Sequence, residues 1–368
     1  MPNPSEASAL AGAVLTVDLG AIVANWRALA ARSKGAECAA VVKADAYGLG
    51  ADRVGPALAA AGCRTFFVAH PDEGIRLRAV LGAGPRIAVL HGPMPGTEGA
   101  FTAHDLLPVL SAAWQVKGWA AFARGSGGRS PAIVQIDSGM TRFGLSEADL
   151  AAVGDDLAAF DIALVMSHLA CADEPDHPAN DEQRARFAAA RARFPGAKAS
   201  LAASSGIFLG PDFHADLVRP GAALYGVAPR ADIPNPMRPV VRLAARIVQL
   251  RDVPEGTPVG YGWTERTTRP SRLATLAVGY ADGFLRSLSG RAAAFYEGTR
   301  LPLVGRVSMD SIVVDVTALG DGAPAPGGTL DLLGPSQGVD ALASAAGTIG
   351  YEILTSLGGR YHRIYTEA

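Results

Sequence analysis

This sequence has few cysteines, a small net charge and no long apolar run. Its three cysteines, Cys38, Cys63 and Cys171, are too few and too widely spaced for a disulfide framework, which favours a reducing compartment. The formal net charge of −2 gives no reason to expect a nucleic acid or an anionic membrane surface as a partner.

No segment has the pattern of a membrane span or of a secretory signal. The longest run without Asp, Glu, Lys or Arg covers residues 199–211, 13 residues, whereas crossing a bilayer takes about 20 apolar residues. No Lys or Arg precedes Arg27, so the basic region of a secretory signal is missing. We therefore expect a soluble, cytoplasmic protein.

The sequence does have a large apolar fraction, 49% of its 368 residues, and length enough for about two or three domains. Between residues 36 and 226, short apolar runs alternate with longer Ala-, Arg- and Glu-rich stretches of helical character. This alternation is typical of βαβ units and a parallel sheet. The predicted strands are 38–43, 65–69, 86–90, 106–110, 132–137, 162–166, 198–202, and either 215–218 or 222–226.

Eight strands predict an α/β fold with an N-terminal (β/α)8 TIM-type barrel over residues 1–240. An open, doubly wound sheet is the competing fold, although it usually has fewer strands. After "DIPNPMRPV" the helical patterns give way to short β-rich runs separated by turns such as "ADG" and "GDG". Residues 241–368 are therefore predicted to form a mostly β C-terminal domain.

Several polar residues and one glycine follow predicted barrel strands, at the ends where barrels place their active sites. Each alone is more simply a solvated strand end, a packed histidine or a turn residue, but a common location makes them a candidate site. They are Lys43, Arg142, His168, Ser204, Ser205, Arg219 and Gly221.

The loops after the seventh and eighth strands, "ASSGI" and "RPGAALYG", carry the hydroxyls and glycines of a phosphate site. Ordinary turn chemistry explains them equally well without the barrel. A phosphate at this end and a lysine after strand one together indicate pyridoxal 5′-phosphate, with Lys43 as its Schiff-base partner.

The segment "AVVKADAYGLG" resembles the cofactor-lysine signature of alanine racemases. The resemblance continues through "DSGMTRFG", "MSHLACAD", "DLVRPGAALYG", "VGYGWTE", "GRVSMD" and "TIGYEILTSLGGRYHRIY", which together span nearly the whole chain. It implies a homodimer with shared active sites that interconverts L- and D-alanine on pyridoxal phosphate and supplies D-alanine for peptidoglycan and cell wall biogenesis.

The resemblance also implies a role for individual residues. Lys43 and Tyr261 are the expected catalytic bases on opposite faces of the substrate α-carbon, with Tyr261 supplied by the partner subunit. The expected cofactor-binding residues are Lys43, Tyr47, His168, Ser204, Arg219, Gly221 and Tyr351. The expected substrate-binding residues are Arg142, Met309 and Asp310.

Three positions depart from the family pattern. Gln135 stands where many members have a carbamylated lysine that holds the substrate-site arginine, so Gln135 can orient Arg142 only by hydrogen bonds. Ala203 replaces a common asparagine, which leaves Ser204 and Ser205 both possible as the phosphate ligand. Ser308 replaces a common cysteine, with little expected consequence.

Other functions remain open at this point. A broader serine/alanine racemase fits the same motifs, because an apolar pocket rejects one added hydroxyl only about a hundredfold. A barrel-type decarboxylase is disfavoured by "GYGWTE" and "GRVSMD", and a non-catalytic pyridoxal phosphate-binding barrel by the large β domain. The pair His168 and Cys171 in "HLAC" is too small a ligand set to indicate a metal, and none is expected.

Overall fold

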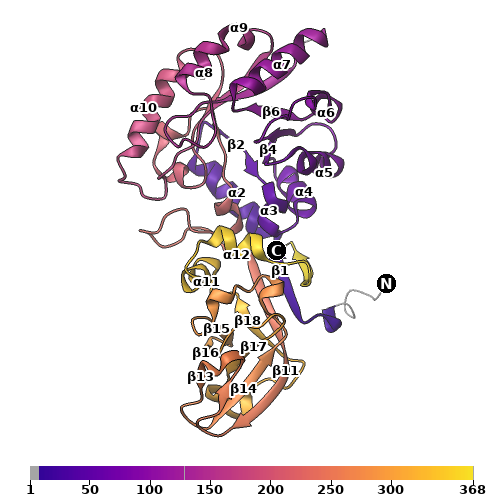
Figure 1. Cartoon of the computed structure of the whole chain (residues 1–368), viewed down its shortest axis with the longest axis vertical. Helices are drawn as coiled ribbons and strands as arrows, with labels where there is room; N and C mark the ends of the chain where they lie inside the picture. The colour runs from indigo at the N-terminus through magenta and orange to yellow at the C-terminus, as the bar shows by residue number, and fades with distance from the viewer. Residues whose placement is uncertain (1–7, 128, 368) are drawn as a thin grey trace. The chain divides into compact units, whose positions relative to one another are not determined.

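The computed structural model describes residues 8–127 and 129–367 (Figure 1). The chain divides into two compact units. One runs from Ile22 to Arg238, and the other combines the residues up to Ala21 with those from Pro239 onward.

The unit from Ile22 to Arg238 is built on parallel strands with helices outside them (Figure 1). Neighbouring strands pair in chain order, each through a parallel register. The strands are β2 (Glu37–Cys38), β3 (Ala40–Val41), β4 (Thr65–Val68), β5 (Arg86–Val89), β6 (Leu107–Leu110), β7 (Pro131–Gln135), β8 (Asp161–Met166), β9 (Ala199–Ser200) and β10 (Leu217–Val218).

The parallel sheet closes on itself. β10 pairs in parallel with β2, which lies on the same extended stretch as β3. On its other side β10 joins β9, since Asp216 N–H donates to the Ala199 carbonyl at 3.0 Å and Arg219 N–H to the Ala202 carbonyl at 2.9 Å. Closure confirms the barrel and excludes the open sheet. Of the two candidates for the last strand, 215–218 is right, because residues 222–225 form a short 3-10 helix.

Helices follow the barrel strands because each connecting segment presents one apolar face. Strands with both faces covered are apolar throughout: Phe66 and Phe67 of β4 are both fully buried, and Trp119 of α7 is buried against Phe101 of α6. The helices are α2 (Leu19–Arg32), α4 (Ala51–Ala60), α5 (Pro71–Leu81), α6 (Glu98–Ala103), α7 (Ala113–Gly125), α8 (Glu147–Ala152), α9 (Gly154–Leu157) and α10 (Ala179–Arg191).

The second unit is mostly β, as predicted. Its long strand β11 pairs with β18 through its first half and with β14 through its second half, so the antiparallel sheet curls round and closes. The main strands are β11 (Val241–Val253), β14 (Ser271–Leu276), β15 (Ala293–Tyr296), β16 (Thr299–Val304), β17 (Ile312–Asp315) and β18 (Thr329–Leu333). Two helices, α11 (Val339–Ala346) and α12 (Gly350–Ser356), precede the last strand, β19 (His362–Thr366).

The first strand of the chain belongs to this β unit. β1 (Ala13–Asp18) pairs antiparallel with β11 and parallel with β19. The sequence prediction grouped residues 1–240 as one domain, and for the residues up to Ala21 the structure differs. In β1, the buried residues Ala13, Leu15 and Val17 alternate with more exposed ones, as in a strand with one covered face.

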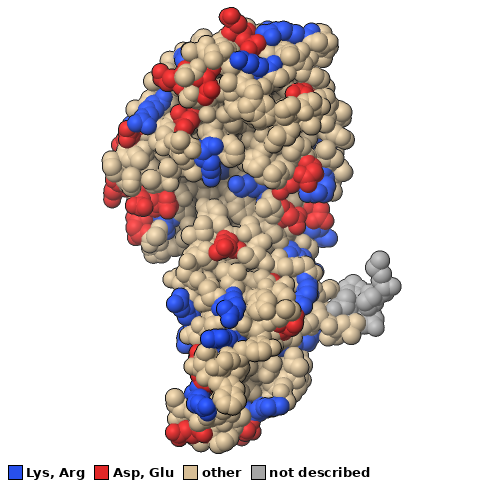
Figure 2. All heavy atoms as spheres, in the orientation of Figure 1, with Lys and Arg blue, Asp and Glu red and all other residues tan. Residues whose placement is uncertain are grey.

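Among the described residues, no helix is both long and apolar enough to cross a membrane. On the face seen in Figure 2, basic and acidic side chains are interspersed on each part. The small net charge is therefore not the sum of two large patches of opposite sign on that face.

Candidate functional site

Lys43 follows β3 and begins an unusual turn. Labelled α3 (Lys43–Gly48), the segment holds Ala44, Asp45, Ala46 and Tyr47 in the left-handed region, with φ between 51° and 56°. Four successive non-glycine residues in this region are strained, at roughly 1–2 kcal/mol each. The turn persists because its polar groups are bonded: Ala46 N–H donates to the Val42 carbonyl at 2.9 Å.

The Lys43 amine is partly buried, close to one cation and one anion. Burial lowers the pKa of Lys43, and the positive charge of Arg142 lowers it further, while the Glu73 carboxylate opposes this effect. A lowered pKa brings the amine closer to its neutral form, in which it can accept a proton or form a covalent bond. A lysine at the end of a buried strand, unfavourable as a charged group, is thereby suited to act as a reactive amine.

Tyr47, Ser204 and Gly221 converge beside the Lys43 turn. The Ser204 hydroxyl accepts hydrogen bonds from Gly221 N–H at 2.9 Å and Ala223 N–H at 3.2 Å. A Cβ at Gly221 would lie 2.3 Å from the Tyr47 hydroxyl oxygen, so only glycine leaves room for that contact. The Tyr47 ring packs on Tyr225 with centroids 4.8 Å apart. Ser204, rather than Ser205, is the serine that faces Gly221.

Gly221→Ala should lower stability by about 1–3 kcal/mol, because the new methyl group displaces the Tyr47 hydroxyl. Thermal melting checks this, with Gly154→Ala as the matched control, since open space surrounds a Cβ at Gly154. Equal melting temperatures for the Gly221 variant and the parent would show that the cradle formed by Tyr47, Ser204 and Gly221 is not closely packed.

Arg219, which follows β10, is a buried cation with neutral partners. Its guanidinium donates to the Ser200 hydroxyl, to the Ser167 carbonyl at 2.6 Å, and to the Leu201 carbonyl at 3.4 Å. Burial lowers the pKa of Arg219 to about 10, so the group stays charged near neutral pH. Its Nη2 lies 3.5 Å from Nδ1 of His168; because a guanidinium can only donate, a hydrogen bond here requires the imidazole proton to be on Nε2.

His168 should make stability fall in mild acid. Burial and then the positive charges of Arg219 and Arg142 lower its pKa from 6.5 to about 3. Below pH 6.5 the unfolded chain therefore binds more protons than the folded one, and the free energy of unfolding drops by up to ~1.4 kcal/mol per pH unit. In urea titrations from pH 6.5 to 4, His168→Gln should show a shallower decline than the parent. Identical slopes would contradict the depressed pKa.

Arg142 and Gln135 lie on the β7 side of the site. Arg142 follows β7, is exposed, and places its guanidinium carbon 5.8 Å from the centroid of the Phe143 ring. Gln135, the last residue of β7, is buried and accepts a hydrogen bond from the Ser111 hydroxyl at 3.4 Å. Among the described contacts, Gln135 bonds to Ser111 and not to Arg142, which the sequence suggested it could orient.

The other four predicted site residues belong to the β unit. Tyr261 begins the short 3-10 helix η4 (Tyr261–Trp263) and is 73% exposed. Met309 and Tyr351 are exposed as well, and Asp310 accepts a hydrogen bond from Arg360 at 2.7 Å.

The remaining predicted site residues lie together at the carboxyl ends of the barrel strands. They are Lys43, Tyr47, Arg142, His168, Ser204, Arg219 and Gly221.

Sequence reasoning missed several residues that hold this site. Ser200 and Ser167 provide the acceptors for Arg219, and Glu73 accepts from Ala44 N–H at 2.7 Å beside Lys43. Glu73 stands in the first turn of α5, a position that predicts a helix cap but gives no sign of the distant contact. Within residues 8–127 and 129–367, no three His, Cys, Asp or Glu side chains are placed to hold a metal.

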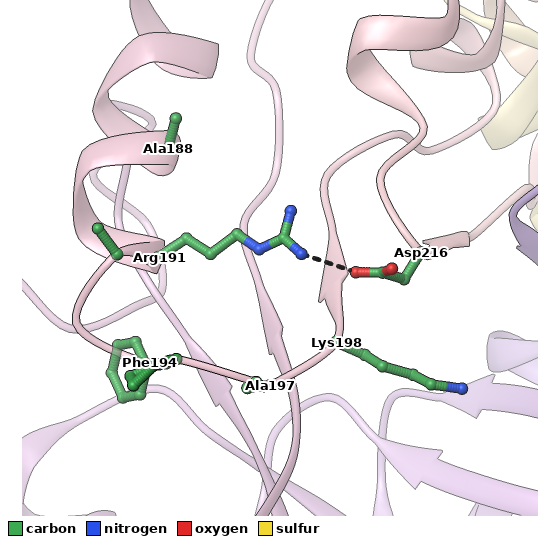
Figure 3. A pocket seen from close by; sticks show the side chains of 9 residues that line it. Ala188, Arg191, Phe194, Ala197, Lys198 and Asp216 are labelled. Atoms are coloured by element: carbon green, nitrogen blue, oxygen red, sulfur yellow. Dashed lines mark hydrogen bonds and ion pairs between the residues drawn. The ribbon is translucent and has the colours of Figure 1, made fainter.

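A surface hollow at the other end of the barrel is not part of this site. Figure 3 shows it between the end of α10 and the start of β9, where Arg191 and Asp216 form an ion pair of 2.9 Å. Asp216 also accepts Ala199 N–H at 2.7 Å, so its carboxylate is engaged in holding the strand. The hollow lies at the amino ends of the strands, which in barrels contribute to stability.

Comparison with protein-family models assigns both parts of the chain to one family. The model of the alanine racemase N-terminal domain matches residues 17–229, and that of the alanine racemase C-terminal domain matches residues 240–365. The chain belongs to the alanine racemase family. The resemblance expected from the motifs is thereby confirmed.

Relatives match over nearly the whole chain. A protein of Mesorhizobium japonicum named "Alanine racemase, catabolic" is 54% identical over 97% of this chain and 94% of its own. An alanine racemase of Rhodospirillum rubrum is 53% identical over 96% of each. The crystal structure of alanine racemase from Bartonella henselae with covalently bound pyridoxal phosphate has a TM-score of 0.93 at 44% identity, and covers 97% of this chain and 100% of its own.

Proposed function

We propose that this protein is a pyridoxal phosphate-dependent alanine racemase, an isomerase that interconverts L- and D-alanine. The observation that carries the proposal is the joint presence, at one end of the barrel, of Lys43 with a lowered pKa and the Tyr47–Ser204–Gly221 cradle. Full-length relatives named alanine racemase support the same substrate.

The residues of the barrel fit the cofactor. The cradle around Gly221 is a place that a Cβ would fill, and it carries the hydroxyls of Tyr47 and Ser204, which suit a phosphate group. Lys43 supplies the amine for covalent attachment. Pyridoxal phosphate would supply an electron-withdrawing ring that makes the α-proton of a bound amino acid acidic. Tyr351 of the β unit is proposed as a further phosphate ligand.

Lys43 and Tyr261 are the proposed bases. A base on each face of the α-carbon allows one group to remove a proton while the other returns one, which inverts the centre. Lys43, partly buried and with a lowered pKa, accepts a proton on one face. Tyr261 acts through its phenolic oxygen on the other.

Arg219 is the proposed partner of the cofactor ring, with neutral His168 beside it. Arg219 stays cationic and has donors but no acceptor, so it holds the ring nitrogen of the cofactor unprotonated. This weakens the withdrawal of electrons by the ring and disfavours side reactions that need a long-lived carbanion. Arg142 is proposed to bind the substrate carboxylate, together with Met309 and Asp310.

We propose a homodimer in which Tyr261, Met309 and Asp310 serve the site of the partner subunit. Tyr261 and Met309 are 73% and 53% exposed, although both are large and largely apolar. Such residues fit an interface, where their burial is favourable.

The proposed physiological role is supply of D-alanine for peptidoglycan in the cytoplasm. The opposite role, breakdown of alanine, is the second candidate, because the Mesorhizobium relative is named catabolic. Deletion of the gene separates them: a requirement for added D-alanine supports biosynthesis, and loss of growth on alanine alone supports catabolism.

Proton NMR in heavy water tests the proposed activity and its breadth. With L-alanine, the purified protein should remove the α-proton signal and produce D-alanine on chiral analysis. L-Serine in a parallel sample tests a broader racemase, because one hydroxyl is rejected only about a hundredfold by an apolar pocket. No exchange with either amino acid, in protein shown to contain the cofactor, would contradict the proposal.

A further inference from the structure

We propose that Glu73 is a positioning residue for Lys43, holding the left-handed turn in place through one carboxylate oxygen. The inference rests on the proposed function for its catalytic consequence, but not for the contact itself. Neither the motifs nor the comparisons assign Glu73 any role.

The two carboxylate oxygens of Glu73 accept hydrogen bonds from different segments of the chain. Oε2 accepts from Ala69 N–H at 2.7 Å and from His70 N–H at 3.1 Å, which closes a capping box at the start of α5. Oε1 accepts from Ala44 N–H at 2.7 Å. Capping of α5 accounts for Oε2 alone, so the bond to Ala44 needs another explanation.

Ala44 is the first residue of the left-handed turn and directly follows Lys43. Its φ of 51° is strained for alanine, and a charge-assisted hydrogen bond is strong enough to offset such strain. The next residue, Asp45, accepts Ala51 N–H through its side chain at 2.7 Å, which ties the turn to the start of α4. Glu73 thus fixes the direction in which the chain leaves Lys43.

The charge of Glu73 also matters beside Lys43. One cation acts on the amine, because the positive charge of Arg142 lowers the pKa of Lys43. Lys43 in turn lowers the pKa values of His91 and His168, which favours their neutral forms. His70 lies against His91, with their Nδ1 atoms 3.2 Å apart. Glu73 provides negative charge in this group, so its removal should lower the pKa of Lys43 further.

Amide hydrogen exchange of the holoenzyme, read on a peptide covering residues 43–50, tests the contact. Glu73→Gln should raise exchange at Ala44 about ten- to hundredfold, because an amide cannot replace the carboxylate toward all three N–H groups. Its kcat for alanine should fall about ten- to hundredfold with KM changed less than about threefold, since misplacement of Lys43 affects the reaction more than binding. The acid limb of its pH–rate profile should move to lower pH.

Two control variants separate the alternatives. Asp149→Asn removes the capping-box carboxylate of α8, away from the site, and Asp72→Asn removes a charge beside Glu73. Both should leave exchange at Ala44 and kcat at parent values. Glu73→Asp keeps the charge and can still cap α5, but its shorter side chain should release Ala44, so exchange rises while the acid limb stays in place.

The outcomes are distinct. Parent-like exchange in both Glu73 variants, or faster exchange with unchanged kcat, would overturn the positioning role. If Glu73→Gln fails to fold, Glu73→Asp carries the same test. A parent enzyme with no racemase activity would refute the proposed function while the exchange contrast still reported on the Glu73–Ala44 bond.

Discussion

Lys43→Ala is expected to reduce alanine racemisation by at least about 10⁴-fold and to remove the covalently attached cofactor. Two functions are lost together, the attachment point and one of the two proposed bases, and groups that act as a unit give large, non-additive losses. The measurement is borohydride reduction followed by mass spectrometry, which marks the lysine that carries the cofactor, alongside the visible absorbance of the protein.

Lys34→Ala is the matched control, because Lys34 is exposed and lies before β2 in the same unit. It should keep both the label and the activity. A Lys43→Ala protein that still carries the reduced cofactor would mean that another lysine holds it, and the assignment of Lys43 would be wrong.

Tyr261→Phe should slow racemisation about 10²- to 10⁴-fold while the cofactor stays bound. The substitution removes only the phenolic oxygen, which is the proposed base, and Tyr261 is too exposed in its own unit for the loss of one hydroxyl to unfold the protein. Tyr296→Phe, in β15, is the control and should retain parent activity. Parent rates in both directions for Tyr261→Phe would refute the two-base assignment.

Mixing the two inactive variants tests whether the site is shared. A hybrid of Lys43→Ala and Tyr261→Phe subunits contains one site with both groups intact and one site with neither. Statistical exchange should therefore restore about a quarter of the parent activity in a two-fold dimer. If subunit exchange is demonstrated and no activity returns, the partner does not supply Tyr261.

The barrel could be predicted because its information is local. Each strand is a short apolar run between helical segments, and parallel strands joined by helices leave few topologies. The polar residues after β3, β7, β8 and β10 then follow from the strands, since the fold places their ends together. Tyr47 owes its prediction to the family resemblance alone, whereas Ser204 is also expected from its place after a predicted strand.

What could not be predicted depends on pairing at a distance or on strained backbone. β1 has the alternating pattern of any half-covered strand, and nothing local says that it joins β11 and β19 instead of the barrel. Residues 44–47 contain no glycine, so their left-handed turn contradicts local preference. Glu73 matches a helix cap, and its second oxygen meets Ala44 only because the barrel brings two loops together.

The origin of the proton at the α-carbon tests the central claim, two bases on opposite faces, most directly. L-Alanine with protium at the α-carbon is converted in heavy water, and the first D-alanine formed is analysed by mass spectrometry. Two bases predict that this product carries solvent deuterium from the start, because the proton removed by one base is not the one returned by the other. Early D-alanine that retains the substrate's own protium would show that a single base serves both faces, and would contradict the paired roles of Lys43 and Tyr261.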